Sequence, residues 1–247
     1  MKVVALVSGG KDSCYNIVQA IKDGHEIVAL GNLYPENKEV EELDSYMYQT
    51  VGHGAIDLYA EAFELPLYRE PITGSPLCLD SVYQKNEKDE VEDLFRLLTK
   101  IKKDIPFDAV ASGAIFSNYQ RVRIEDICSR MGLKSLTYLW ERNQRELLQE
   151  MISCPIEAIV VKVATLGLDE SHLGKTIAEL QPHLLKMADK FGINVCGEGG
   201  EYETFTLNCP LFKKKLVLKE TEVVPNGADV YHLLLKSLVL QDKKDGN

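Results

Sequence analysis

The sequence predicts an α/β protein: a doubly wound, Rossmann-like parallel sheet with a second, smaller α+β domain. Strand-like and helix-like segments alternate through the first half of the chain, as a parallel sheet with crossover helices requires. Near residue 140 the alternation stops, and a stretch of different character begins with a connecting helix and a long strand. The expected domains are therefore residues 1–140 and residues 141–247.

The first element is the short branched run "VVALV" at residues 3–7, typical of a strand buried on both faces. A helix is expected directly after it, because four apolar residues follow at helical spacing: Cys14, Ile17, Val18 and Ile21. The next strand is expected at 26–34. Asp44 is then a candidate N-cap for a helix over 44–63.

The remaining elements follow from the same periodicities and from turn residues. Up to the expected boundary they are a strand at 66–70, a helix at 91–101, a strand at 107–115 that runs into a turn at Gly113, a helix at 118–132 and a strand at 134–140. Beyond it they are a helix at 143–153, a strand at 157–167, a helix at 175–191 that Pro182 could kink, and loop and strands over 197–224.

Composition narrows the class of protein. The 28 basic and 38 acidic residues give a net charge of −10, which makes nucleic acid an unlikely main substrate, although a local basic patch can exist within an acidic total. No apolar run reaches the length of about eighteen residues that spans a membrane, and the start shows no signal-peptide pattern. A cytoplasmic protein with no membrane partner is expected. The six cysteines form no C-x-x-C pair, so we expect buried thiols and neither a zinc nor an iron–sulfur site.

The segment "SGGKDS" at residues 8–13 lies where the first strand ends and the first helix begins. In open parallel sheets this edge binds ligands, glycines let backbone amides approach an anion, and a helix N-terminus adds positive potential. Lys11 adds a full charge, while Asp12 and Ser13 could cap the helix or meet a magnesium ion. The spacing matches neither the Walker nor the dinucleotide fingerprint. The alternative is a tight turn without a ligand.

Two further segments carry charge near glycines or at the same sheet edge. "GEGGEYETF" sets three glutamates, Glu198, Glu201 and Glu203, around a glycine pair, and could be only a solvated acidic loop. "SNYQRVR" begins the helix after the fourth strand, where Arg121 and Arg123 could bind phosphate or a protein substrate, or could form a plain surface face. His53 is as easily structural as catalytic.

The "SGGKDS" loop resembles the signature of the PP-loop, or N-type, ATP pyrophosphatases. The resemblance implies a sheet of the PP-loop/HUP type, Mg-ATP as the nucleotide, and an adenylated intermediate formed as pyrophosphate leaves. Asp12 would be the magnesium ligand. The residues implied in nucleotide binding are Ser8, Gly9, Gly10, Lys11, Asp12, Ser13 and Gly113.

The later segment "CGEGGEYETFTLNCP" resembles the signature of the diphthine–ammonia ligases, and similarity extends over roughly residues 1–224. The resemblance implies amidation of the diphthine carboxylate on translation elongation factor 2 by ammonium. Catalysis would rest on Lys11, Glu198, Glu201 and Glu203. Tyr202 and Phe205 would offer aromatic faces to the trimethylammonium of diphthine. The implied substrate-binding residues are Arg121, Arg123, Gly199, Gly200, Tyr202, Thr204 and Phe205.

Two positions depart from the family pattern: Asn208 stands where aspartate is usual, and Lys88 where glycine often stands. Two other functions remain open. One is a tRNA-modifying adenylase of the same superfamily, which the acidic balance and the lack of paired cysteines disfavour. The other is a non-catalytic ATP-binding module.

Overall fold

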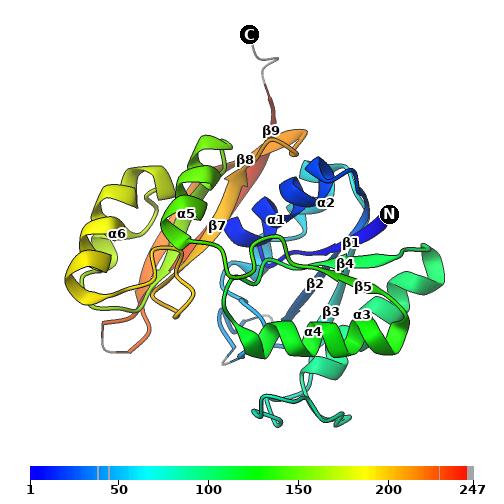
Figure 1. Cartoon of the computed structure of the whole chain (residues 1–247). Helices are drawn as coiled ribbons and strands as arrows, with labels where there is room; N and C mark the ends of the chain where they lie inside the picture. The colour runs from blue at the N-terminus through cyan, green and yellow to red at the C-terminus, as the bar shows by residue number, and fades with distance from the viewer. Residues whose placement is uncertain (38, 44, 228, 244–247) are drawn as a thin grey trace.

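Two sheets form the protein in the computed structural model, which describes residues 1–37, 39–43, 45–227 and 229–243 (Figure 1). The first sheet is parallel, in the order β3-β2-β1-β4-β5: β1 (Lys2–Leu6), β2 (Glu26–Pro35), β3 (Leu67–Ile72), β4 (Ala109–Ala111) and β5 (Lys134–Leu136). The second is antiparallel, in the order β7-β6-β9-β8: β6 (Glu157–Val163), β7 (Tyr202–Asn208), β8 (Lys214–Pro225) and β9 (Tyr231–Asp242). The predicted fold class is confirmed.

Helices cover both faces of the parallel sheet, as Figure 1 shows. On one side lie α1 (Lys11–Lys22) and α2 (Leu58–Phe63), and on the other α3 (Val91–Asp104) and α4 (Asn118–Met131). Alternate side chains of β1 serve the two faces: Val3 and Ala5 join the core with α1, whereas Val4 joins the core with α3 and α4. Because β1 contacts a core on each face of the sheet, both of its faces must be apolar.

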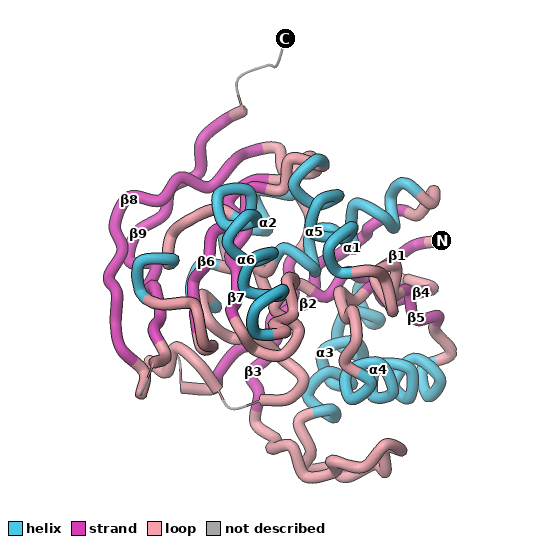
Figure 2. The backbone as a smooth tube through the Cα atoms, turned by 60° about the vertical axis from the view of Figure 1, so that its left-hand side comes forward, coloured by secondary structure: helices cyan, strands magenta, loops and turns pink. Residues whose placement is uncertain are grey.

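The second sheet lies beside α1, and helices α5 (Gln144–Ser153) and α6 (Ile177–Phe191) pack on it (Figure 2). Its core is continuous with that of the first sheet, because Ile17 of α1 belongs to the same buried cluster as Phe205 of β7 and Leu184 of α6. The boundary near residue 140 stays a prediction. In the described part of the chain, no helix is both long and apolar enough to cross a membrane.

Local signals explain where several helices begin and end. The Ser117 side chain accepts a hydrogen bond from the amide of Gln120 at the start of α4, and Gly132 ends that helix in the left-handed region. Thr176 and Glu179 form a reciprocal capping box before α6, which continues through Pro182. These ends fall within two residues of the expected ones.

The expected helix over 44–63 is wrong for most of its length. The structure has irregular backbone there, a single 3₁₀ turn at His53–Ala55, and only α2 at its end. Gly52, with φ of 79°, interrupts the helix, and the Ser45 hydroxyl accepts backbone hydrogen bonds that hold a turn instead. Asp44, the proposed cap, lies outside the described residues. Several strands are also shorter than expected, β4 and β5 having three residues each.

The cysteines follow the expectation in part. All six are free, and Cys14, Cys128, Cys196 and Cys209 are buried. Cys78 and Cys154, however, are only partly buried.

Candidate functional site

A cleft of about 170 Å³ opens at the carboxyl end of the parallel sheet. It lies where the strand order reverses, with β2 on one side of β1 and β4 on the other, which is where ligands bind in folds of this class. Polar residues of the loops after β1 and β4 form one part of the lining: Ser8, Asp12, Ser13, Ser112 and Gly113. Apolar side chains form another part: Leu33, Met47, Leu94, Leu97 and Ile124. The lining therefore has a polar part, around the start of α1 and the loop after β4, and an apolar part, which suits a nucleotide.

The glycine loop is held from behind by the second sheet. Gly9 has a φ of 96°, and a Cβ there would lie 2.8 Å from the Ile56 side chain and 3.0 Å from Phe205. The carbonyl oxygen of Gly9 accepts hydrogen bonds from the amide of Thr206 and the hydroxyl of Tyr59, at 2.8 and 3.0 Å. Glycine is required here both for its backbone angle and for this close approach.

Lys11 begins α1 and is almost fully buried, with 2% of its surface exposed. Its Nζ donates to the carbonyl oxygen of Cys196 at 2.5 Å and to Asp12 Oδ2 at 2.9 Å, while its amide donates to Thr204 Oγ1. Burial opposes the charge, but the Asp12 carboxylate outweighs it and holds the pKa of Lys11 above its usual value. Lys11 is therefore a fixed cation that joins the glycine loop to the second sheet.

Two polar atoms on the lining of the cleft have no partner in the protein. They are Asp12 Oδ1 and Ser112 Oγ, both buried. A buried polar atom without a hydrogen bond is costly, so such atoms indicate a ligand or water. A free carboxylate oxygen fits one ligand of a magnesium ion carried on ATP phosphates. In the described ranges, no group of three or more His, Cys, Asp or Glu residues forms a metal site.

Gly113 brings the loop after β4 against the start of α1. A Cβ at this position would lie 2.7 Å from the backbone nitrogen of Ser13 and 2.8 Å from the carbonyl carbon of Asp12. These are backbone atoms that cannot swing aside, so any side chain at Gly113 would push the loop away from the helix N-terminus. This residue controls the width of the cleft at its polar part.

Of the three predicted glutamates, only Glu198 lines the cleft. Its Oε2 accepts a hydrogen bond from the amide of Phe116, so the second half of the chain closes over the loop after β4. Burial raises the pKa of the Glu198 carboxyl, and the negative charge of Asp12 adds to the effect. Glu198 is therefore a carboxyl group on the cleft whose pKa lies above that of an exposed glutamate.

Glu201 and Glu203 have partners elsewhere. Glu201 accepts hydrogen bonds from the amides of Asn194 and Gly199, at 2.8 and 2.7 Å, and so shapes the glycine loop that carries Glu198. Glu203 Oε1 lies 3.4 Å from Lys162 Nζ. Burial raises the pKa of Glu203, and its Oε2 has no hydrogen-bond partner. Gly200, at φ of 81°, provides the turn between these acidic residues.

Ion pairs around Glu203 connect the segment before Met47 with strands of the second sheet. Lys162 also pairs with Glu42, and the other carboxylate oxygen of Glu42 lies 3.0 Å from His232 Nε2. Although burial works against it, the bonds from His232 and Lys162 lower the pKa of Glu42. Glu42 precedes the irregular stretch that supplies Met47 to the cleft.

The two aromatic side chains of β7 are buried and do not line the cleft, and the contact of Tyr202 and Phe205 with a trimethylammonium group stays a prediction. Phe205 is fully buried behind the glycine loop, packed against Tyr59 with ring centroids 5.6 Å apart. The Tyr202 hydroxyl donates to the carbonyl oxygen of Val195, and its ring lies 5.2 Å from Lys11 Nζ. The Thr204 hydroxyl oxygen accepts a hydrogen bond from the Lys11 amide, so β7 supports the glycine loop.

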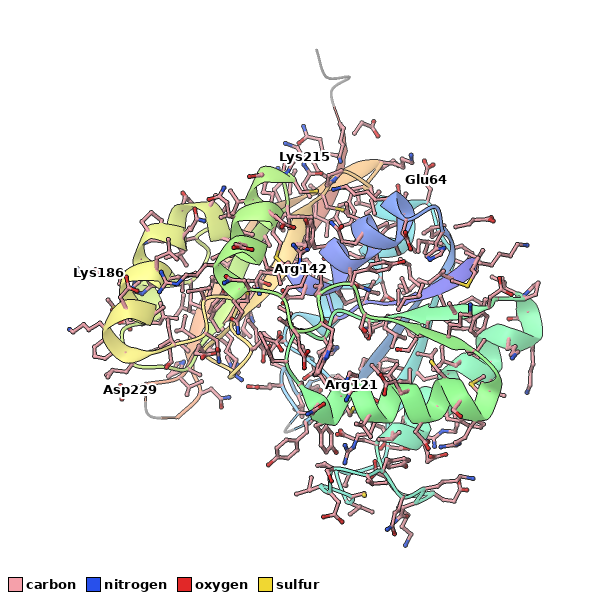
Figure 3. The ribbon with its side chains drawn as sticks, in the orientation of Figure 1. Glu64, Arg121, Arg142, Lys186, Lys215 and Asp229 are labelled. Carbon is pink, nitrogen blue, oxygen red and sulfur yellow. The ribbon has the colours of Figure 1, made fainter. Side chains whose placement is uncertain are left out.

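The two arginines of α4 differ. Arg123 is fully buried and donates to the carbonyl oxygens of Tyr119, Cys78 and Asp80, and a substrate contact by this residue stays a prediction. Arg121 is partly exposed, pairs with Glu125 and lies over the Trp140 ring, and Figure 3 shows it at the start of α4. A substrate contact by Arg121 stays a prediction.

Several lining residues were not anticipated. Gln49 lines the cleft and donates to the carbonyl oxygen of Thr204, and Asn32 lines it while donating to the carbonyl oxygen of Val7. Ser112 could have been found, since it directly follows the fourth strand and precedes Gly113. Gln49 could not, because it lies in the stretch expected to be helical.

Comparison with known proteins places this arrangement in a family. Models described as the diphthamide synthase N-terminal and C-terminal domains match residues 1–135 and 143–238. A diphthine–ammonia ligase of Rattus norvegicus is 57% identical, with 98% of this chain and 94% of that protein covered. The Homo sapiens relative is 56% identical at the same coverage, and that of Schizosaccharomyces pombe 51%, with 99% of this chain and 40% of that protein covered. The chain belongs to the diphthine–ammonia ligase family.

Proposed function

We propose that the protein is a carbon–nitrogen ligase that amidates the diphthine carboxylate of translation elongation factor 2, with ATP and ammonium, to give diphthamide, AMP and pyrophosphate. Relatives named diphthine–ammonia ligase over nearly the whole chain support the overall reaction. The observation that carries the mechanism is one cleft lined by Ser8, Asp12 and Ser13 around the start of α1 and by Glu198 of the second half. Lys11 is buried beside this lining and pairs with Asp12.

In the first step a carboxylate oxygen of the substrate attacks the α-phosphorus of ATP, and pyrophosphate leaves. The leaving group accumulates negative charge, so fixed donors and cations there stabilise the transition state most. We assign this role to the amides of Gly9 and Gly10, the N-terminus of α1 and Lys11. Asp12 would hold the magnesium ion that accompanies the phosphates, through its free oxygen.

In the second step ammonia attacks the acyl carbon, and AMP leaves. Ammonium cannot attack until it loses a proton, so the step needs a base near the acyl group. Glu198 is the glutamate of its loop that lines the cleft, and its raised pKa makes its carboxylate a better base. We assign proton removal to Glu198, and loop support to Glu201.

Product analysis tests the reaction. Purified protein is supplied with ATP, magnesium, ammonium and diphthine-bearing elongation factor 2. We expect AMP and pyrophosphate in equal amounts, matched by new amide on the factor. ADP and inorganic phosphate would refute adenylation, and ATP binding without turnover would indicate a binding module.

A further inference from the structure

Exposed apolar side chains occur on three segments that are linked to the lining of the cleft by hydrogen bonds or by sequence neighbours. Among the described residues, large hydrophobic side chains that are at least 48% exposed include five from these segments: Tyr46, Leu77, Leu79, Val82 and Phe116. We call these five the rim. Leu77, Leu79 and Val82 belong to the excursion 73–90, which projects from the body below α4 in Figures 1 and 2. Exposed apolar side chains gathered in this way mark an interaction site.

Two buried carboxylates accept hydrogen bonds from the backbone of the excursion. Asp89 is 1% exposed and accepts hydrogen bonds from the amides of Leu77 and Cys78, at 3.0 and 2.9 Å. Asp93 is fully buried and accepts from the amides of Thr73 and Gly74. The excursion therefore presents its apolar side chains on an ordered backbone, which reduces the entropy lost when a partner binds.

Arg123 fastens the excursion to α4. Its guanidinium donates to the carbonyl oxygens of Cys78 and Asp80 and lies 3.3 Å from the centre of the Tyr119 ring. The Tyr119 ring in turn packs against Tyr46, with centroids 5.6 Å apart. Contacts thus run without a break from the excursion to Tyr46.

The same contacts reach the lining of the cleft. Tyr48, which lines it, donates its hydroxyl to the carbonyl oxygen of Glu90 at the base of the excursion, and Ser45 donates to the Glu90 carboxylate. At another point of the mouth, the amide of Phe116 bonds Glu198. A substrate side chain that enters the cleft must bring its flanking surface against these residues.

We propose that the rim docks the protein that carries the reacting carboxylate, through apolar side chains of that protein around the reactive residue. This inference rests on the proposed function and extends it to the binding surface of the macromolecular substrate. Hydrophobic contact at the mouth would position the carboxylate, while the cleft performs the chemistry.

Charge on these segments favours a protein over a nucleic acid. Three basic side chains there are already paired, Arg121 with Glu125, Arg96 with Asp93 and Lys85 with Glu87, and Lys88 is exposed without an ion pair among the described residues. Binding to a phosphate backbone depends on cations that neutralise phosphates, and paired cations serve this poorly. Exposed leucine, valine and aromatic side chains suit the apolar centre of a protein interface.

The test compares the double variant Leu77→Ser, Val82→Ser with Leu166→Ser. Leu166 is 70% exposed and follows β6, so it is a matched loss of an exposed apolar side chain away from the rim. Binding of diphthine-bearing elongation factor 2 is measured by titration calorimetry, and AMP release by steady-state kinetics. We expect Kd and KM for the factor to rise about tenfold in the rim variant, with KM for ATP unchanged, and within twofold in the control.

The outcomes separate this inference from the function. The docking surface would be overturned if Kd and KM for the factor stayed within twofold of wild type in both variants, or rose equally in both. This holds even if the wild type makes AMP and amide. Rim-dependent binding by a wild type that makes no AMP would support the surface and refute the function. Binding of tRNA that weakens in the rim variant and falls steeply with salt would overturn a protein partner. Melting temperatures check that both variants fold, since all three side chains are exposed.

Discussion

Replacing Gly113 with alanine should widen the polar part of the cleft and weaken catalysis without unfolding the protein. The new Cβ would lie 2.7 Å from the Ser13 nitrogen, whereas ordinary contact begins at 3.4 Å. Since both neighbours are backbone, the loop after β4 must retreat from α1 by roughly 0.7 Å. A displacement of about 1 Å at a reacting centre costs about 10²-fold in rate.

We therefore expect Gly113→Ala to lower kcat/KM for ATP by roughly 10²-fold, measured as AMP release at saturating ammonium and protein substrate. The strain should cost about 1–3 kcal/mol, or about 2–4 °C of melting temperature per kcal/mol, because the sheet can relax only in part. Calorimetric titration with ATP separates weaker binding from slower chemistry.

Gly54→Ala is the matched control. A Cβ there meets nothing within 4 Å, and its φ is not in the left-handed region. This variant should keep wild-type activity and melting temperature within error. If Gly113→Ala matches Gly54→Ala in both measurements, the close approach of the two loops has no role in the site.

Three further predictions concern Lys11, the glutamates of the glycine loop and the Glu92–Arg130 pair. Lys11→Met should lower kcat by about 10²–10³-fold, because the developing pyrophosphate charge loses its fixed cation, and AMP release measures it; unchanged turnover would remove Lys11 from the mechanism. Glu198→Gln should slow amide formation at least about 10²-fold, since no base then takes the ammonium proton, whereas Glu201→Gln should mainly lower the melting temperature; equal losses of turnover would contradict this division of roles. Although burial alone would raise it, Arg130 holds the pKa of Glu92 below its usual value of 4.5. The stability that this pair adds is present above pH 4.5 and disappears as pH falls through the lowered folded-state pKa. The free energies of unfolding of wild type and Glu92→Gln, from urea melts, should therefore converge as pH falls below 4.5, and a constant gap would refute the role of the pair.

The parallel sheet could be predicted because its signals are local. The branched run at β1 and the helical spacing of α3 and α4 follow directly from burial on one or two faces. The stretch 45–57 could not be predicted, since its conformation is set by Gly52, by the turn at Ser45 and by Gln49 bonding to Thr204 of a distant strand. A helical composition there is overridden by tertiary contacts.

The position of the site could be predicted from the sequence, but the roles of its individual residues could not. The glycine loop and Lys11 follow from strand, glycines and helix in sequence, and the structure puts Glu198 at the same cleft. Sequence could not separate Glu198 from Glu201, because the difference is which amides each carboxylate bonds. Nor could it show that Phe205 supports Gly9 from behind, a contact between residues far apart in the chain.

Isotope transfer tests the central claim most directly. The diphthine carboxylate of elongation factor 2 is labelled with oxygen-18, and the nucleotide products are analysed by mass spectrometry after amidation. If the carboxylate attacks the α-phosphorus, one labelled oxygen leaves with AMP when ammonia displaces it. We expect one oxygen-18 in AMP for each amide formed. Label in inorganic phosphate, or AMP without label, would contradict an acyl adenylate formed in this cleft.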